Sequence, residues 1–331
     1  MGSPITSLAC LLIIIMSAHG GPDPTLDNHW KLWVLQHKKV YMNAMEEMRR
    51  RMIWEDNLKF VTVHNLEYSL GLHTFEVGMN HLADMTSEEV VATMTGIRAP
   101  DITELNYTSR LDKLDSVFPD SIDWRTKDCV TEVKYQGECA SCWSFSATGA
   151  LECQMKLKTG KLQSLSEQEL VDCSGSYGNY GCKGGWVENA IKYVTEHGLA
   201  LESSYPYEGK EGTCRSAPTA ATCRAFKMLS YGNELLLQNA VGTVGPVSVL
   251  IDSSQQSFYL YKNGVYYDPK CNPRNLIHAV LAVGYDKENG AAYWLVKNSW
   301  GLGWGEQGYI KMARNRFNHC GIAGHCVYPI V

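Results

Sequence analysis

The sequence predicts an α+β fold in residues 118–331, with a helical half followed by an antiparallel β half. Apolar residues recur at helical spacing over 142–158, 166–171 and 186–196. Segments rich in Val, Ile, Leu and Tyr, which favour strands, lie at 246–251, 279–285, 293–297 and 308–313. Helices first and strands later are typical of α+β proteins, whereas α/β proteins alternate the two.

Residues 1–20 are expected to form a signal peptide. The run from Leu8 to Met16 holds nine apolar residues, too few for a membrane span, which takes about 20. Ala18 and Gly20 supply the small residues of a cleavage site. No later stretch is long and apolar enough to span a membrane, and 12 cysteines fit the oxidising secretory route. We therefore expect a protein of the lysosome, the extracellular space or both.

Residues 21–117, which we call the front segment, are expected to form a separate and mostly helical unit. Helical spacing runs over 25–70, and Gly71 suits a helix end. Residues 98–117 are polar and without a period, as in a linker, so we place a boundary at 117/118. The front segment holds 10 Lys+Arg, 15 Asp+Glu and five of the ten His. Its docking electrostatics should therefore weaken as the pH falls toward about 5.

Composition argues against two classes of function. The formal net charge is −5, and the longest basic run is only residues 49–51, so the basic footprint of a nucleic-acid binder is missing. Cys139 and Cys142 form the single C-x2-C pair, and neither a second pair nor spaced His accompanies it, which argues against a zinc site. We expect no cofactor and no metal.

Cys142 stands where a thiol nucleophile can be activated. It is the first residue of the helix predicted over 142–158, so the positive end of the helix dipole favours its thiolate. Ser141 suits the cap of that helix, and Gly160 suits its end. Such a nucleophile also needs a base within hydrogen-bond reach.

Strand pairing supplies a candidate base. Strands at 278–285 and 291–298 flank a turn-like stretch, and a hairpin centred on Glu288 places His278 opposite Asn298. An amide there can accept from one imidazole nitrogen and leave the other facing a thiol. A one-residue slip would put the two side chains on opposite faces. Judged from the pairing alone, His278 and Asn298 could equally well be two ordinary polar residues or a catalytic pair.

The residues around Cys142 resemble the nucleophile segment of papain-like cysteine proteases, here Gln-Gly-Glu-Cys-Ala-Ser-Cys-Trp-Ser-Phe at 136–145. In that family a His and an Asn follow roughly 130–150 residues downstream. His278 lies 136 residues after Cys142, and Asn298 lies 156 after it, within Asn-Ser-Trp-Gly. The resemblance covers 25–331 and is closest to cathepsins S and L. It implies a two-lobe fold, with a helical left lobe, an antiparallel β-barrel-like right lobe and a catalytic cleft between them.

The resemblance implies an active cysteine endopeptidase and a role for each matching residue. Cys142 would be the nucleophile, His278 its ion-pair partner and proton donor, and Asn298 the group that orients the imidazole. Gln136 would donate to the oxyanion, and Trp300 would shield the imidazole–amide bond from water. The residues carried over as substrate-binding are Gly184, Gly185, Trp186, Val187, Leu250, Leu276, Ala279, Trp304 and His325.

The front segment resembles the inhibitory propeptide of cathepsin L-like enzymes. The matching residues are Glu46, Arg50, Trp54, Asn57, Val61 and Asn65, followed by Gly-Met-Asn-His-Leu-Ala-Asp at 78–84. The resemblance implies that residues 21–117 cover the cleft and are removed in acid near Phe118, which leaves 118–331 as the mature peptidase.

The same resemblance implies three disulfides, Cys139–Cys182, Cys173–Cys214 and Cys271–Cys320. Cys10 would leave with the signal peptide. No partner is assigned to Cys129, Cys153, Cys223 or Cys326.

Several residues depart from the family pattern near the substrate. Ala140 and Ala279 stand where Gly is usual, and their methyl groups should narrow the S1 and S2 subsites. Leu250 and Trp186 are large for an S2 pocket, so we expect medium apolar side chains at P2, the second residue before the cleaved bond. His325 at the pocket floor could also admit an acidic P2 side chain at low pH.

The same residues leave other functions open. A non-catalytic papain-like binding protein, disabled by the two Gly-to-Ala changes, is the main alternative, and a transferase or exopeptidase on this fold is a minor one. The retained Cys, His, Asn and Gln favour the protease. The resemblance implies peptide and protein substrates, inhibition by the propeptide and by cystatin-type inhibitors, and a monomer. Asn106 lies in the only glycosylation sequon.

Overall fold

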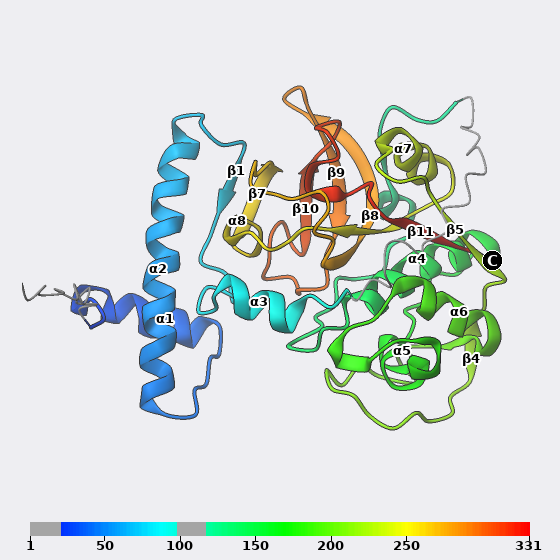
Figure 1. The fold of residues 1–331 in the computed structure, drawn as a ribbon, viewed down its shortest axis with the longest axis horizontal. Helices are drawn as coiled ribbons and strands as arrows, with labels where there is room; N and C mark the ends of the chain where they lie inside the picture. Colours follow the sequence, from blue (N-terminus) through cyan, green and yellow to red (C-terminus); the bar gives the residue numbers. More distant parts are fainter. Residues whose placement is uncertain (1–20, 98–116) are drawn as a thin grey trace, which may run out of the picture.

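The computed structural model describes residues 21–97 and 117–331. The predicted signal peptide with Cys10, the linker up to residue 116 and the sequon at Asn106 lie outside the described residues. The front segment contains α1 (Asp27–Gln36), α2 (Ala44–Ser69), β1 (Phe75–Val77) and α3 (Ser87–Met94). In Figure 1 the long helix α2 stands at the left, and α3 leads from it toward the rest of the protein.

The front segment has a small core and well-defined helix ends. Thr86 and Glu89 form a capping box at the start of α3, each side chain bonding the other's backbone amide. Trp30, Trp33 and Trp54 are buried, with ring centroids of neighbouring pairs 5.5–6.4 Å apart. These rings pack α1 against α2.

The helical lobe contains α4 (Cys142–Thr159), α5 (Glu167–Cys173) and α6 (Val187–His197), close to the three predicted helices. Gly160 ends α4 in the left-handed conformation that glycine adopts without a steric penalty. Ser141 is the N-cap residue of α4 as predicted, but its side chain does not cap the helix. Its hydroxyl bonds the Cys139 carbonyl and the Tyr207 hydroxyl instead of a helix amide.

The β lobe is built on one nine-stranded sheet that also includes β1. Its other strands are β2 (Ile122–Asp123), β5 (Ala225–Met228), β6 (Val247–Ile251), β7 (Tyr261–Tyr266), β8 (His278–Glu288), β9 (Ala291–Lys297), β10 (Tyr309–Ala313) and β11 (Cys326–Ile330). The hydrogen-bonded order is β1-β7-β10-β9-β8-β6-β11-β5, and β2 pairs with β8. Only the β10–β7 pairing within it is parallel.

The predicted order of helices followed by an antiparallel sheet is confirmed, and four strands lie within a few residues of their predicted positions. Elements outside the prediction are β5, β7, β11, α7 (Glu234–Thr243), α8 (Gln256–Tyr259), and the pair β3 (Leu199–Ala200) and β4 (Thr219–Ala221). β7 and β11 were not predicted, because lysine and glycine interrupt the apolar pattern of β7 and proline interrupts that of β11. Pairing with neighbouring strands is what makes them strands.

The predicted register of the β8–β9 hairpin is wrong. Glu288 pairs directly with Ala291, so the turn is the two-residue Asn289-Gly290, and both of its residues have positive φ. That conformation is the tight hairpin turn favoured by Asn-Gly. With a register shift between Ala282 and Gly284, the strands pair Leu281 with Lys297, and His278 is not backbone-paired with Asn298.

The two lobes meet where α4 packs against β8. The Ser146 hydroxyl donates to the Val280 carbonyl at 2.7 Å and lies 2.6 Å from the Ser248 hydroxyl. Side chains of α4, the helix that begins with Cys142, thus bond directly to the strand that begins with His278. This contact fixes the relative position of the two chain segments that matter for chemistry.

Four disulfides are present among the described residues. Three are Cys139–Cys182, Cys173–Cys214 and Cys271–Cys320, the pairs that the resemblance implied. The fourth joins Cys129 to Cys153 on α4, two cysteines that sequence reasoning left unassigned. Cys142, Cys223 and Cys326 are free thiols and buried.

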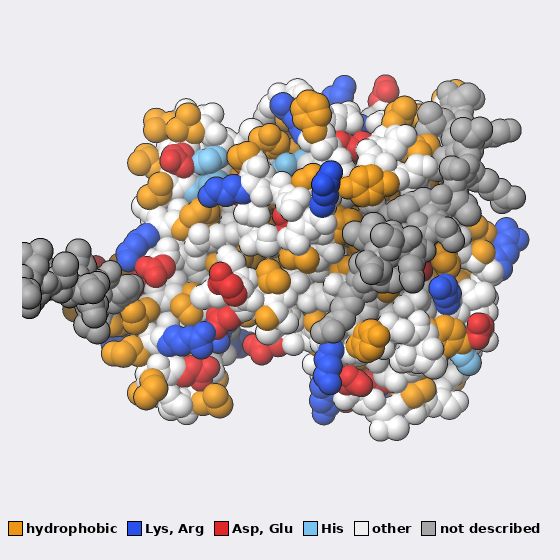
Figure 2. Space-filling model, viewed as in Figure 1, with side chains coloured by type: hydrophobic (Ala, Val, Ile, Leu, Met, Phe, Trp, Pro, Cys, Tyr) orange, Lys and Arg blue, Asp and Glu red, His pale blue; other side chains and the backbone are white. Residues whose placement is uncertain are grey.

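No helix in residues 21–97 or 117–331 is long and apolar enough to cross a bilayer. Apolar side chains are nevertheless exposed at both ends of α2, as Figure 2 shows at the left. They include Met42 and Met45 before and at its start, and Leu66, Leu70 and Leu72 near its end. The front segment is too small to bury all of its apolar surface against its own core.

Candidate active site

His278 and Asn298 meet although they are not paired in the sheet. Nε2 of His278 lies 2.8 Å from Oδ1 of Asn298, and both side chains are buried. The same oxygen accepts from the backbone amide of Ser299 at 2.8 Å, which fixes the orientation of the Asn298 amide. Because an amide oxygen can only accept, Nε2 carries the proton and Nδ1 carries the lone pair. Nδ1 is buried and has no hydrogen-bond partner among the described residues.

Trp300 covers the imidazole, as the resemblance implied. Its ring centroid lies 4.9 Å from that of His278, with 30° between the planes. Trp300 in turn packs edge-on against Trp304 and Phe258. This fully buried aromatic group excludes water from the bond between His278 and Asn298, which strengthens that bond.

The Cys142 thiol lies at the first residue of α4, beside the backbone amides of Ala279 and Gly96. Those amides favour the thiolate, but complete burial outweighs them and raises the pKa of Cys142 to about 11. Burial likewise lowers the pKa of His278 to about 4, despite the favourable bond to Asn298. With the front segment in place, both groups are therefore held in their uncharged forms, and the expected ion pair is suppressed.

Gln136 extends its amide between the two lobes. Its Nε2 donates to the carbonyl of Cys139 at 2.8 Å and to the carbonyl of Met94 in the front segment at 3.1 Å. Its Oε1 accepts from the Ser299 hydroxyl at 2.5 Å. The donor expected to serve an oxyanion is thus occupied by a carbonyl group of the front segment.

The front segment runs through the site in an extended conformation after α3. The amide of Gly185 donates to the carbonyl of Gly96 at 2.8 Å, and the amide of Ile97 donates to the carbonyl of Ile277 at 3.2 Å. A Cβ at Gly96 would lie 2.0 Å from the carbonyl oxygen of Ala140, so only glycine fits there. Backbone groups of both lobes therefore form hydrogen bonds with residues 96 and 97 directly over Cys142.

The rest of the front segment docks on the sheet. β1 pairs antiparallel with β7, and the amide of Gly78 donates to the carbonyl of Leu260 at 2.7 Å. The Asn57 side chain donates to the carbonyls of Ala83 and Met85 and accepts from Gln256 and Tyr259. Its place in the propeptide-like pattern has a physical reason, since one amide joins α2, the loop before α3 and the β lobe.

Most of the residues predicted to bind substrate gather beside Cys142. Trp186, Val187, Leu250 and Ala279 belong to one buried apolar cluster that includes Cys142, and Leu276 packs against it. Gly185 presents backbone because a Cβ there would lie 2.6 Å from the Trp143 ring; Gly184 precedes it with a φ of +108°. Trp304 lies in the other cluster, against Phe258 and Trp300, away from these residues.

His325 is buried and differs from the free pocket-floor imidazole that the sequence suggested. Its Nε2 lies 2.5 Å from Oε1 of Glu188, which is also buried. Sequence reasoning did not single out Glu188. A signal was present, because Glu188 follows Val187 in the first turn of α6 between residues of the buried face.

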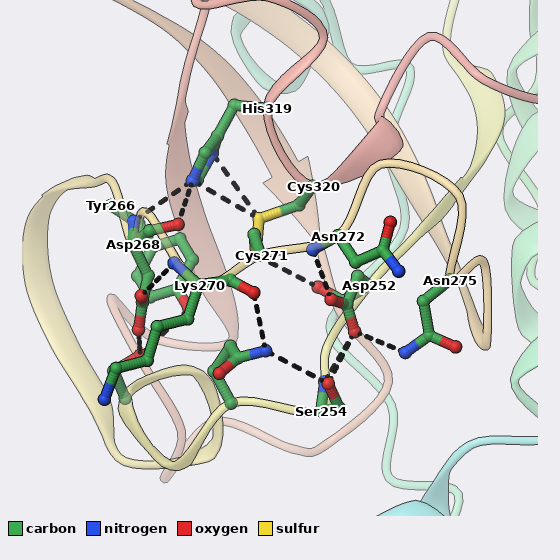
Figure 3. The surroundings of a disulfide bond; sticks show 12 residues. Asp252, Ser254, Tyr266, Asp268, Lys270, Cys271, Asn272, Asn275, His319 and Cys320 are labelled. Carbon is green, nitrogen blue, oxygen red and sulfur yellow. Dashed lines mark hydrogen bonds between the residues drawn. A yellow bond between two sulfur atoms is a disulfide. The ribbon is translucent and has the colours of Figure 1, made fainter.

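One cluster of metal-ligating residue types occurs among the described residues, namely Cys271, His319 and Cys320. Figure 3 shows that the two sulfurs are joined as a disulfide, with His319 bonded to the backbone of Asp268 and Asp252 bonding Asn272 and Asn275. A disulfide offers no thiolate, so this cluster stabilises loops and is unsuited to hold a metal ion.

Comparisons with known proteins agree with this geometry. The family described as papain family cysteine protease matches residues 118–330, and the cathepsin propeptide inhibitor domain matches residues 30–90. The chain is 55% identical to cathepsin S of Bos taurus over 325 residues, covering 97% of this chain and 98% of that protein. It is 54% identical to cathepsin S of Mus musculus over 317 residues, covering 93% and 91%.

Solved proenzymes share the whole arrangement, front segment included. Digestive procathepsin L 3 of Tenebrio molitor aligns with a TM-score of 0.84 at 42% identity, covering 93% of this chain and all of that one. A recombinant stem bromelain precursor aligns with a TM-score of 0.81 at 36% identity, covering 93% of this chain and 99% of that one.

Proposed function

Since the chain belongs to the papain family of cysteine proteases and is a cathepsin S/L-like endopeptidase made as a zymogen, we propose that Cys142 and His278 are its catalytic pair. The observation that carries this proposal is the bond from Nε2 of His278 to Oδ1 of Asn298. It leaves Nδ1 as the basic nitrogen, in the tautomer that can take the thiol proton. Asn298 and Trp300 hold the ring in this state.

The first half of the reaction acylates the sulfur. Cys142 passes its proton to Nδ1 of His278, and the thiolate attacks the carbonyl carbon of the peptide bond. The carbonyl oxygen becomes an oxyanion, which receives hydrogen bonds from the Gln136 side chain and from the Cys142 amide. The C–N bond then breaks, the imidazolium protonates the leaving amine, and a thioester remains on Cys142.

The second half regenerates the enzyme. His278 removes a proton from a water molecule, and the resulting hydroxide attacks the thioester carbon. The oxyanion forms again at the same donors. When it collapses, the C–S bond breaks, the carboxylic acid product leaves, and the thiolate recovers its proton from the imidazolium.

The front segment blocks this chemistry in the zymogen, and we place its removal near Phe118, in acid, to give a mature domain of residues 118–331. Two contacts support this reading. The Met94 carbonyl occupies the Gln136 donor, and Gly96 lies beside the Cys142 sulfur. A chain held over the sulfur excludes both substrate and water.

Narrower features of the function follow from the relatives and the predicted signal peptide. We propose entry into the secretory pathway with action in lysosomes or outside the cell, glycosylation at Asn106, inhibition by cystatin-type proteins, and a monomeric mature enzyme. The Ala279 methyl and the Leu250 side chain, both in the buried apolar cluster with Cys142, support a narrow S2 subsite that takes medium apolar P2 side chains.

Thiol labelling after acid processing tests the catalytic assignment. We expect an epoxide-type thiol reagent to label Cys142 in the acid-treated wild type, to leave the Cys142→Ala chain unlabelled, and to label Cys223→Ala as it labels the wild type. Mass spectrometry of the labelled peptide and of the new N-terminus reads out both results. Labelling at Cys223 or Cys326, or none in a folded and processed protein, would contradict the assignment.

A further inference from the structure

Glu188 and His325 form a buried pair of an acidic and a basic side chain beside the cleft. The side chains are 5% and 3% exposed, and the nearest nitrogen and oxygen are 2.5 Å apart. Among the described residues, neither carboxylate oxygen of Glu188 nor Nε2 of His325 has a hydrogen bond of regular geometry. Each group therefore depends on the other for electrostatic compensation, because an unpaired charge at such a depth is very unfavourable.

Local structure holds both members in position. Glu188 lies in the first turn of α6, where the helix dipole favours a negative charge. The carbonyl of His325 accepts from the amide of Leu250, which fixes its backbone against β6 at 3.1 Å. The imidazole lies against the Trp186 ring, with centroids 4.6 Å apart.

This pair lies next to the path of a bound chain. Ile97 of the front segment is bridged to Gly185, the residue directly before Trp186. Its side chain packs on the apolar cluster that contains Trp186, Leu250 and Cys142. A peptide that replaces the front segment in the cleft therefore places a side chain against the same apolar cluster. The Glu188–His325 pair lies next to that cluster, where His325 contacts the Trp186 ring.

We propose that Glu188 is a specificity-determining residue, which occupies the imidazole of His325 and so makes the pocket select uncharged P2 side chains. This inference rests on the proposed function. It replaces the idea that His325 alone attracts an acidic P2 residue. In the folded chain the Glu188 carboxylate already contacts the His325 imidazole. An incoming P2 carboxylate would therefore be repelled by the like charge of Glu188.

The test compares matched peptides that differ only at P2, carrying Val, Gln or Glu, with the mature wild type and Glu188→Gln at pH 5. The Gln side chain keeps the shape of Glu188 and removes the carboxylate that occupies His325, so the imidazole is free to pair with a P2 carboxylate. We expect the ratio of kcat/KM for P2 Glu over P2 Gln to rise about tenfold or more in the variant, while the ratio for P2 Gln over P2 Val stays unchanged.

Two further variants separate charge from structure. Glu188→Gln combined with His325→Gln should return the Glu-over-Gln ratio to the wild-type value, because the imidazole that would pair with the P2 carboxylate is gone. His325→Gln alone should shift selectivity the opposite way, toward P2 Lys over P2 Gln, and it can be read even where Glu188→Gln fails to fold. An unchanged Glu-over-Gln ratio in Glu188→Gln, or an equal rise in the double variant, overturns the proposal.

Titration of Cys142 with the thiol reagent is made on every variant. Full titration together with an unchanged P2 ratio rejects the role of Glu188 alone. A wild type that does not titrate rejects the proposed catalytic pair instead.

Discussion

Single side chains in this zymogen serve different partners before and after activation, and Gln136 is the clearest case. Its amide nitrogen donates to the Met94 carbonyl of the front segment, and Ser299 holds its other end. A carbonyl at that place is the ground-state counterpart of the oxyanion that forms during peptide cleavage. The front segment thus engages the same donor that we propose for the transition state.

Replacing Gln136 tests its role at the level of one residue. In the mature enzyme, Gln136→Leu keeps much of the volume and removes the donor, so we expect kcat to fall about 10²- to 10³-fold with a smaller change in KM. Steady-state kinetics with a peptide substrate measures this. Ser299→Ala, which removes only the group that positions Gln136, should lower kcat by a smaller factor. A kcat unaffected by Gln136→Leu would show that the oxyanion is stabilised elsewhere.

At the scale of elements, the extended stretch after α3 forms the inhibitory contact. Gly185 bonds the backbone of Gly96 and Ile277 bonds that of Ile97, so these contacts depend little on side-chain identity. Gln136 bonds the carbonyl of Met94 at the end of α3. The fit of this stretch depends strongly on close approach, because the chain passes Ala140 with no room for a Cβ at Gly96. Inhibition by backbone contact requires glycine at this one position.

We therefore expect Gly96→Ala to weaken the seating of the front segment on the cleft. The new methyl group would meet the backbone of Ala140, which cannot move as a side-chain end can. The full-length variant should react with the thiol reagent at pH 7 at least about tenfold faster than the wild type, which corresponds to roughly 1.4 kcal/mol of lost docking. Gly21→Ala, where nothing lies within 4 Å, is the matched control. Equal rates in both variants would argue against close approach as the cause.

At the scale of the whole molecule, burial of histidines links docking of the front segment to pH. His81 packs edge-on against Tyr135 of the mature part, and its Nε2 is buried without a partner among the described residues. Burial first, then the charges of Lys39 and His37, lower the pKa of His81 to about 4, while Asp84 opposes the shift. Burial also lowers the pKa of His37 and of His64.

The sign of this coupling favours release in acid. The pKa of His81 is about 4 when docked, below its ordinary value of 6.5, so the released front segment binds the proton more readily. The contribution of His81 to docking is complete above about pH 6.5 and is lost as the pH falls toward 4, by up to about 3 kcal/mol. His81→Phe cannot titrate and should lower the pH of half-maximal processing by about half a unit or more.

Processing of the full chain over a series of pH steps measures that shift. His29→Asn serves as control because His29 is exposed on α1 and should leave the midpoint unchanged. A midpoint that stays in place in His81→Phe would assign the acid response to other groups, such as His37 or His64.

The sequence by itself determined the elements that local chemistry specifies. The end of α4 follows from Gly160, and the α+β order follows from the change of periodicity. The identities of Cys142, His278 and Asn298 as candidates also follow from spacing and resemblance. The predicted hairpin register is wrong because the turn is the two-residue Asn289-Gly290, a strong turn signal, and not a five-residue stretch centred on Glu288. The imidazole and the amide still meet, since Asn298 lies just beyond β9.

Only the tertiary structure decided which distant groups share one environment. Cys129 and Cys153 form a disulfide because their segments meet in space, which no spacing rule revealed. Glu188 faces His325 because α6 begins beside the loop before β11, and the uncharged state of Cys142 follows from a front segment that covers it. Charge compensation and burial arise from contacts across more than a hundred residues, so they depend on packing, whereas helix ends and turns depend on the few residues that form them.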